Sequence, residues 1–236
     1  MSVASHMRNS LLVAMLVGLS GSVHAVTEAR AEAPKSASQA AEAWTEDGLK
    51  RVTIEGVDAA FARPGSSLSV YDKVQLLPPS VAFRRDWGRS SGTMTGRVRA
   101  EDAQAIKDRL AQLLTQELAR EFKEGGYELS DQPGDDVLAV EVRIVDLNIV
   151  APDVPSMSRK EVYAVSAGQM SLVAELRDSA SGESVLRVFD HEKGETSVQM
   201  RRITRMDNVQ EATRLASGWA RTLRQQLDAA HAHSTD

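Results

Sequence analysis

Residues 136–150, DVLAVEVRIVDLNIV, are the longest stretch of this sequence with an apolar residue at every second position. The apolar residues occupy even positions from 138 to 144 and odd positions from 145 to 149. Because the side chains of a strand point alternately to its two faces, an unbroken strand would turn the second set away from the first. One extra residue at Ile144 and Val145 would return both sets to the same face. The stretch therefore predicts a central strand with a bulge or bend at that point.

Shorter alternating runs predict further strands on both sides of this one. They lie at residues 57–61, 70–77, 80–83, 127–129, 170–176 and 185–189. Pro78 and Pro79 separate the second and third runs, and because proline has no amide hydrogen for a ladder, that part of the chain belongs at an edge or a bend. Ser181 and Gly182 form a turn signal between the last two runs, which predicts a hairpin.

Two further segments have apolar residues at spacings of three and four, which is typical of amphipathic helices. The first starts at an acidic pair at 101–102 and ends at two glycines, where a left-handed residue can cap it. The second follows a polar loop at residues 190–207, begins at Asn208 in a capping box with Glu211, and runs to Leu227. Hairpin strands with helices at two points of the chain favour an α+β fold. We expect one largely antiparallel, twisted sheet with two long helices packed on one face.

The first 25 residues have the pattern of a secretory signal peptide. Arg8 precedes an apolar run at residues 11–19, and small residues follow at the positions before Ala25 that a signal peptidase reads. The run is shorter than the roughly 20 residues that span a bilayer. Translation could start at Met1 or at Met7. Cleavage after Ala25 would leave a periplasmic or secreted protein without a transmembrane segment.

The mature chain is expected to consist of a flexible tether at residues 26–47, a single domain at 48–230 and a frayed tail at 231–236. The tether prediction depends on residues 26–39, which mix Ala, Glu, Lys, Pro and Ser without apolar periodicity. Residues 40–44 could form a helical turn. Trp44 is the first large side chain that could dock on the domain.

Composition excludes several classes of protein. The sequence has no cysteine, so it has neither disulfides nor the cysteine that bacterial lipoproteins acylate, and a core must supply its stability. It contains 28 basic and 33 acidic residues. Removal of the signal peptide takes away one arginine, so the formal net charge of the mature chain is 27 − 33 = −6. An acidic exported chain is a poor nucleic-acid binder, so no nucleic-acid partner is expected.

Several short motifs occur in an order that is similar to a known family. They are YDKV at 71–74, VAFR at 81–84, VDLN at 145–148, APD at 151–153 and SAGQM at 166–170. With a proline and a tryptophan around the second motif, they resemble a bacterial family of exported proteins catalogued as a domain of unknown function, number thirty-three thirteen. The resemblance covers about residues 48–227. It implies an exported protein without an assigned activity; many relatives are lipid-anchored, whereas this chain has no cysteine after its signal.

Few residues could perform catalysis near neutral pH. After signal removal only His191, His231 and His233 remain, and the last two lie in the expected tail. A Ser-His-Asp triad would have to use His191, and the sequence has no Gly-x-Ser-x-Gly motif to present a serine. Two histidines at a flexible end favour an adventitious metal contact over a native one. No native metal site is therefore expected. The sequence also has no glycine-rich phosphate loop, and no cofactor is expected.

The basic segment at residues 84–99 is the best candidate for a binding site. Its first part contains Arg84, Arg85, Asp86, Trp87 and Arg89. Arginine beside tryptophan can hold a carboxylate, a phosphate or an anionic glycan. The structural alternative is that the tryptophan packs under the loop and the aspartate pairs with a neighbouring arginine.

A second candidate is the loop at residues 151–161, which contains Pro152 and Asp153 and is long for a connection between strands. Its structural alternative is an ordered connection held by prolines. The leading hypothesis is a non-enzymatic periplasmic protein that binds an envelope protein or an anionic envelope polymer, such as peptidoglycan or lipopolysaccharide, through both loops. The alternative hypothesis is a hydrolase that acts on envelope material through carboxylates or a Ser/Lys pair.

Overall fold

The computed structural model describes residues 36–87, 99–149, 162–164, 168–194, 201–203 and 205–234. The chain divides into two units, Met1–Glu32 and Ala33–Asp236, and every described residue belongs to the second. The predicted signal peptide therefore lies outside the described residues. Within the described part of the chain, no helix combines the length and the apolar character that crossing a membrane requires.

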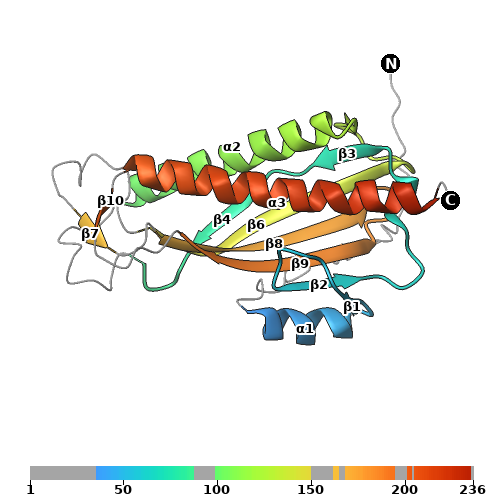
Figure 1. Ribbon diagram of the computed structural model, residues 1–236, viewed down its shortest axis with the longest axis horizontal. Coiled ribbons are helices and arrows are strands. Elements are labelled where there is room, and N and C mark those ends of the chain that lie inside the picture. The colour runs from blue at the N-terminus through green and yellow to red at the C-terminus, as the bar shows by residue number, and fades with distance from the viewer. Residues whose placement is uncertain are drawn as a thin grey trace, which may run out of the picture. The chain divides into compact units, whose positions relative to one another are not determined.

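The second unit combines three helices with an eight-stranded sheet (Figure 1). In chain order the elements are α1 (Ala37–Glu46), β1 (Lys50–Val52), β2 (Ala59–Ala62), a 3-10 turn (Leu68–Val70), β3 (Lys73–Leu76), β4 (Ser80–Phe83), α2 (Ala100–Glu124), β5 (Glu128–Leu129), β6 (Val137–Ile149), β7 (Val162–Ala164), β8 (Gly168–Asp178), β9 (Ser184–Lys193), β10 (Arg201–Ile203) and α3 (Arg205–Ser234). β7 and β10 form a separate antiparallel pair. The α+β class predicted from the sequence is confirmed.

The main sheet has the strand order β1-β2-β9-β8-β6-β3-β5, and β4 also pairs with β6. β3 and β4 both run parallel to β6, whereas β8 and β9 form the predicted antiparallel hairpin. β3 pairs with residues 137–140 of β6 and β4 with residues 143–147. Pro78 and Pro79 lie between these two strands, where no ladder hydrogen bond is required of them. The prolines thus divide one side of β6 between two short strands.

The predicted irregularity of β6 is present, but it lies between Val145 and Asn148, just after the predicted position. Val145 is opposite Ser171, and the next pair is Asn148 with Gln169, so two residues of β6, Asp146 and Leu147, correspond to the single residue Met170 of β8. Asp146 takes up the extra residue with a φ of 52°, a left-handed conformation that aspartate tolerates better than most residues. The bulge returns Leu147 to the face of Ile144, while Val145 remains on the other face.

Each face of the sheet has its own core. α2 and α3 both cover the face that carries the even-numbered apolar residues of β6 (Figure 1), which confirms the predicted packing of the two long helices. The buried apolar residues of α2 all belong to the predicted stripe, namely Ile106, Leu110, Leu114, Leu118 and Phe122; Leu113 of the stripe is partly buried, and Glu121, which is not part of the stripe, is also buried. The helix ends as expected, because Gly126 has a φ of 87° after Gly125. α1 packs on the opposite face through Ala40 and Trp44.

Four details differ from the sequence-based expectations. Residues 37–46 form α1 inside the expected tether, because the ring of Trp44 docks edge-on against Phe61 at 5.6 Å. The loop expected at residues 190–207 contains the end of β9 and all of β10, and α3 begins at Arg205, so the capping box at Asn208 is wrong. Val70 belongs to the 3-10 turn and not to a strand. The expected frayed tail is helical to Ser234.

Candidate functional site

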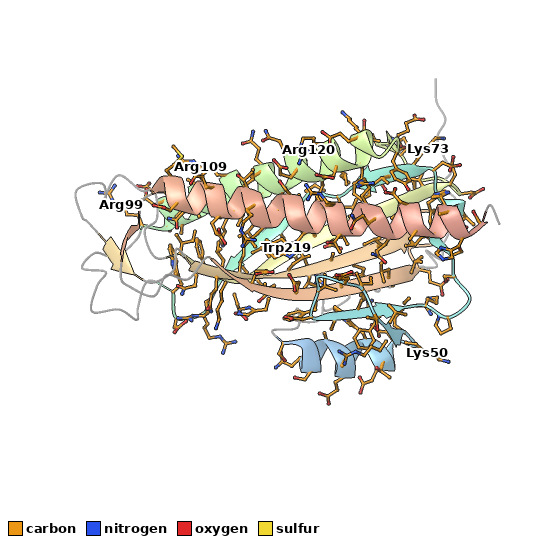
Figure 2. The ribbon with its side chains drawn as sticks, viewed as in Figure 1. Lys50, Lys73, Arg99, Arg109, Arg120 and Trp219 are labelled. Atoms are coloured by element: carbon orange, nitrogen blue, oxygen red, sulfur yellow. The ribbon has the colours of Figure 1, made fainter. Side chains whose placement is uncertain are left out.

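A cavity of about 240 Å³ lies between the N-terminal halves of α2 and α3 and the neighbouring ends of β6 and β8. Its inner wall consists of buried aliphatic side chains, namely Ile106, Leu110, Leu147, Met170 and Leu215. Exposed or half-buried polar residues form its rim, namely Arg109, Asn148, Gln169, Asn208 and Glu211. Val209 also lines the cavity and is 56% exposed, so the cavity opens to solvent beside the start of α3. Figure 2 shows Arg99 and Arg109 at this end of α2.

Two backbone features of the strands shape the floor of this cavity. The bulge at Asp146 turns Leu147 toward the helices, so the last part of β6 contributes an aliphatic wall. Gly168 begins β8 against the end of β6, and a Cβ atom there would lie 2.2 Å from the carbonyl oxygen of Asn148. A side chain would therefore push the two strands apart. Glycine at this position lets the first residues of β8 lie close to the end of β6 and form the floor of the cavity.

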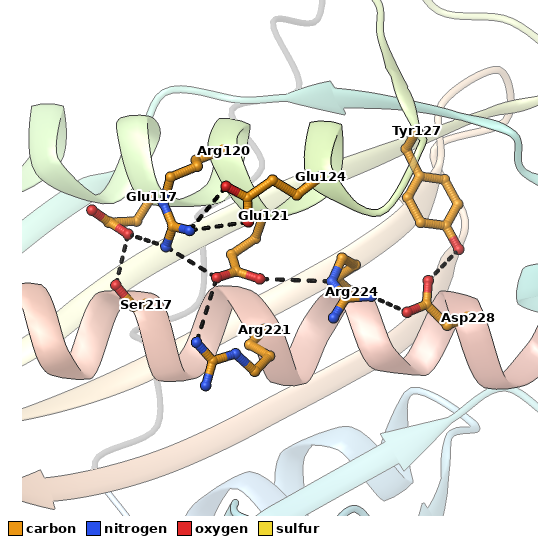
Figure 3. A network of polar contacts seen from close by, with 9 residues as sticks. All are labelled: Glu117, Arg120, Glu121, Glu124, Tyr127, Ser217, Arg221, Arg224 and Asp228. Atoms are coloured by element: carbon orange, nitrogen blue, oxygen red, sulfur yellow. Dashed lines mark hydrogen bonds and ion pairs between the residues drawn. The ribbon is translucent and has the colours of Figure 1, made fainter.

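The two helices run side by side in the same direction, which places both of their N-termini at the cavity. Along the pair, Ser217 donates to Glu117 at 2.6 Å, Glu121 lies 3.6 Å from Arg224, and Tyr127 donates to Asp228 at 2.9 Å (Figure 3). These contacts follow the same order along both helices, which shows that the helices are parallel. Parallel helix dipoles repel each other, and ion pairs across the interface offset that repulsion.

Glu121 is the buried centre of this network. It is 4% exposed, and its carboxylate lies within 3.0 Å of Arg120, 3.8 Å of Arg221 and 3.6 Å of Arg224. A buried carboxylate without such partners would cost several kcal/mol. Because the three guanidinium groups surround it, Glu121 holds α2 and α3 together and keeps the walls of the cavity in place.

The predicted binding residues at 84–87 form a compact turn. The guanidinium of Arg84 donates to both oxygens of Asp86, at 2.6 and 3.2 Å, and the amide of Trp87 donates to the carbonyl of Arg84 at 2.9 Å. Arg85 is exposed. Arg84 and Asp86 thus engage each other, in the arrangement that the structural alternative describes. Arg89, Pro152 and Asp153 lie outside the described residues.

Trp87 connects this turn to the cavity. Its ring stacks on Phe83 with centroids 3.8 Å apart and an angle of 6° between the planes, and Lys107 lies 5.9 Å from the centre of the Phe83 ring. The indole Nε1 donates to the carbonyl of Ile149 at 3.1 Å. Ile149 lines the cavity, so Trp87 supports the cavity wall from outside.

A serine and a histidine do meet in the structure, on the strands β8 and β9. The Oγ of Ser171 lies 2.8 Å from Nδ1 of His191. Ser171 is fully buried, however, and Asp58 accepts a hydrogen bond from the main-chain amide of His191. A nucleophile must be reachable by its substrate, and a triad needs an acid bound to the imidazole. Within the described part of the chain, the pair therefore has neither an accessible nucleophile nor an acid bound to the imidazole.

The alternative hydrolase would need two suitable carboxyl groups, and the sheet brings one pair of acids together. Glu141 and Glu175 are directly opposite each other, and both bind the guanidinium of Arg177. Burial alone would raise the pKa of Glu175, but the hydroxyl of Ser184 and the guanidinium of Arg187 hold it below its usual value. Glycoside hydrolysis needs one carboxyl with a raised pKa as the general acid. The pKa of Glu175 is shifted in the opposite direction.

Asp190 is an acid whose pKa is shifted upward. Burial raises its pKa although Trp219 donates to it. The side chain is 4% exposed, and its two oxygens accept from Nε1 of Trp219 at 2.7 Å and from the amide of Asp58 at 3.2 Å. Figure 2 shows Trp219 reaching from α3 toward the sheet. Both oxygens are thus used to join β9, α3 and the chain before β2, which makes Asp190 a structural link.

The remaining histidines contact main-chain oxygens. Nε2 of His231 lies 3.1 Å from the carbonyl of Tyr71, and Nδ1 of His233 lies 2.6 Å from the carbonyl of Ala229. The first contact fixes the end of α3 to the start of β3, so residue 231 is part of the packed domain. Over the described residues, no group of three or more metal-ligating side chains comes together.

Sequence reasoning did not find the cavity, although one signal for it exists. Gly168 at the start of β8, Gly194 after β9 and Ala212 on α3 are three small residues that line the cavity. Where side chains are this small, a helix and a sheet leave space that larger residues would fill. The signal becomes visible only when the elements that meet are known.

The fold and the cavity define an α+β protein whose sheet is covered on one face by two parallel helices, with a small apolar cavity between the helices and the sheet. Residues 42–223 match the family described as "Protein of unknown function (DUF3313)", and the chain belongs to that family. This confirms the resemblance found in the motifs. No curated protein matches the sequence.

Many solved structures resemble the chain distantly, and three of them serve as examples. They are a PelC dodecamer from Paraburkholderia phytofirmans (13% identity, TM-score 0.35, 75% of this chain and 96% of that chain), the protein XCC0632 from Xanthomonas campestris (14%, 0.40, 71% and 93%) and a minor lipoprotein from Acinetobacter baumannii (11%, 0.33, 68% and 94%). At these values nothing about activity or partners passes to this chain.

Proposed function

We propose that this protein is a non-enzymatic protein of the cell envelope that binds a partner molecule through the cavity between α2 and α3. The observation that carries the proposal is an apolar cavity that opens to solvent beside Val209. A cavity lined by aliphatic residues with a few polar groups at its rim is the usual form of a small binding site. The predicted signal peptide supports export.

Binding is favoured over the alternative hydrolase by the chemistry of Ser171, Glu175 and Asp190. Ser171 is buried, the pKa of Glu175 is lowered, and both oxygens of Asp190 are bound by donors. None of these residues lines the cavity. Turnover of ester substrates or peptidoglycan fragments by the purified protein, lost in Ser171→Ala or Glu175→Gln, would overturn the proposal.

The proposal is tested by filling the cavity. Ala212 lines it, so Ala212→Trp introduces a large ring into the space, whereas Gln210→Trp places the same ring on the exposed side of the same helix. The immobilised mature protein and both variants are incubated with an envelope extract, and retained lipids and proteins are quantified by mass spectrometry. We expect a component that the wild type and Gln210→Trp retain and that Ala212→Trp loses. Equal retention by all three proteins would overturn the proposal.

In this proposal Arg84 and Trp87 support the cavity and do not hold a polymer. Because Arg84 binds both oxygens of Asp86, its guanidinium is already engaged. We therefore expect the wild type and Arg84→Ala to co-sediment equally with purified peptidoglycan. A clear loss in Arg84→Ala would instead favour the anionic envelope polymer that the basic segment predicts.

A further inference from the structure

We propose that the cavity takes the aliphatic chain of a single-chain amphiphile, such as a fatty acid or a lysolipid, and that the head group stays at the rim. The inference rests on the proposed function, since it names the ligand of the same site. It is carried by three properties of the cavity: the chemistry of its wall, the change in polarity toward its mouth, and its size.

The chemistry of the wall favours an aliphatic ligand. Leu110, Leu147, Met170 and Leu215 supply the buried surface, and no aromatic side chain occurs among the described residues that line the cavity. Sites for sugar rings and for flat aromatic ligands usually present aromatic side chains, whose faces stack on the ligand. A saturated chain needs only close contact with aliphatic groups. A glycan is therefore a poor match for this wall.

Polarity changes along one path from the inside of the cavity to the surface. Met170 is 5% exposed at the floor, Val209 is 56% exposed at the mouth, and Met206 is 61% exposed outside it. Met206 and Val209 lie three residues apart and thus on one face of α3. Around this apolar path stand the polar side chains of Asn148 and Asn208. An amphiphile has the same order of parts, with an apolar chain inside and a polar head outside.

The size of the cavity limits the ligand to one chain. Its volume of about 240 Å³ exceeds the ~150 Å³ of an engineered cavity that holds benzene. It is smaller than the roughly 300–1,000 Å³ of sites for drug-sized ligands. One short run of methylene groups fits this range, whereas the two chains of a phospholipid do not.

A length series of alkyl phosphocholines tests the inference, because the head group stays constant while the chain grows. Binding to the mature protein is measured by titration calorimetry below the micelle concentration of each compound. Each added methylene should tighten binding about fourfold until the cavity is full, after which the affinity should level off. No binding, or an affinity that keeps rising without a plateau, would overturn the inference.

Two variants and their controls connect the plateau to the cavity. Ala212→Trp should abolish binding, and Val209→Glu, at an exposed position that leaves the core intact, should weaken it at least tenfold. Gln210→Trp and Gln210→Glu make the same changes on the exposed face of α3 and should bind as the wild type does. Unchanged binding in both cavity variants would overturn the inference even if the length series shows a plateau.

The outcome separates the ligand class from the proposed function. If Ala212→Trp loses a component of the envelope extract while no alkyl phosphocholine binds, the proposed function stands and the amphiphile is wrong. Phosphatidylcholine vesicles form a further arm of the test. The inference would be overturned if the wild type and Ala212→Trp bind equally to intact vesicles while the single-chain compounds do not bind. The apolar residues around Met206 would then be assigned to contact with a bilayer surface.

Discussion

Glu121 of α2 lies 3.6 Å from Arg224 of α3, and this contact crosses the interface of two parallel helices that enclose the cavity. Glu121 is buried, whereas Arg224 retains some exposure to solvent. Replacing Glu121 by Gln removes the charge that the surrounding guanidinium groups share. We expect the free energy of unfolding to fall by about 2–3 kcal/mol, less than for a fully buried pair, because the arginines are partly solvated.

Glu124→Gln is the matched control for this change. Glu124 binds Arg120 from the same network at 3.1 Å, but its side chain is 60% exposed. Exposed pairs contribute little, so the loss should stay below about 0.5 kcal/mol. Urea denaturation of both variants measures the difference. Equal losses would contradict the central position of Glu121.

Gly168→Ala and Gly218→Ala should change stability in opposite directions. A Cβ atom at Gly168 would meet the carbonyl oxygen of Asn148 at 2.2 Å, so β8 must shift, at a cost of about 2 kcal/mol or more. Gly218 lies on an exposed part of α3, and nothing lies within 4 Å of an added Cβ. Alanine is a better helix former than glycine, so this variant should gain roughly 0.5–1 kcal/mol. Thermal denaturation measures both signs, and a neutral Gly168→Ala would show that the hairpin does not close against β6 as described.

Much of the fold follows from periodicity, because alternation and helical spacing record which face of an element is buried. The strand β6, the hairpin β8–β9 and the stripe of α2 were predictable for that reason. The place of the bulge was not, since a parity change at Val145 fits a bulge on either side of that residue, and the pairing with β8 decides between them.

α1 was harder to predict because its partners are distant in sequence. Ala40 and Trp44 dock on Phe61 and Phe189, and nothing local in residues 36–47 indicates that surface. The cavity has the same origin. It depends on the way in which Ala212 of α3 and Gly168 of β8 come to line the same space, which only the tertiary structure defines.

Trp44→Ala should release α1 and leave the long helices in place. Trp44 is 4% exposed and belongs to the small core on the outer face of the sheet, which α2 and α3 do not share. Loss of the ring removes most of the apolar surface by which α1 is held. Hydrogen exchange should become fast at residues 37–46 and stay slow at residues 106–122. Fast exchange in both segments would show that the two cores are one cooperative unit.

Trp87→Phe and Trp87→Ala separate the two contacts of the indole. Phenylalanine keeps the stacking on Phe83 but loses the hydrogen bond to Ile149, at a cost of about 1 kcal/mol. Alanine loses both contacts, so the cost should rise to about 2–3 kcal/mol. Urea denaturation measures the two values. A neutral Trp87→Ala would mean that the turn does not support the cavity wall, and the tryptophan would then be available for partner contact.

Acid should destabilise the protein partly through Glu175. Its folded-state pKa is lowered, against the effect of burial, by Ser184 and Arg187. The ionised carboxylate therefore stabilises the fold above its unfolded-state pKa of about 4.3, and this contribution is lost as the pH falls through the lower folded-state pKa. Glu175→Gln should flatten the fall in unfolding free energy between about pH 5 and pH 3. A fall as steep as in the wild type would contradict the shift.

Asp190→Asn should make the fall in unfolding free energy between about pH 5 and pH 3 steeper. Burial raises the pKa of Asp190, so the folded state binds its proton more tightly than the unfolded chain does. Its contribution to stability is greatest below the unfolded-state pKa of about 3.9 and declines as the pH rises through the folded-state pKa. In acid it therefore offsets part of the stability that is lost through Glu175, and the variant lacks that offset.

The same variant should also lose stability at neutral pH. Asparagine has one acceptor oxygen for two donors, Trp219 and Asp58, so we expect a loss of about 1–2 kcal/mol. Urea denaturation across this pH range measures both effects, and a shallower acid slope in Asp190→Asn would show that burial does not govern this carboxyl.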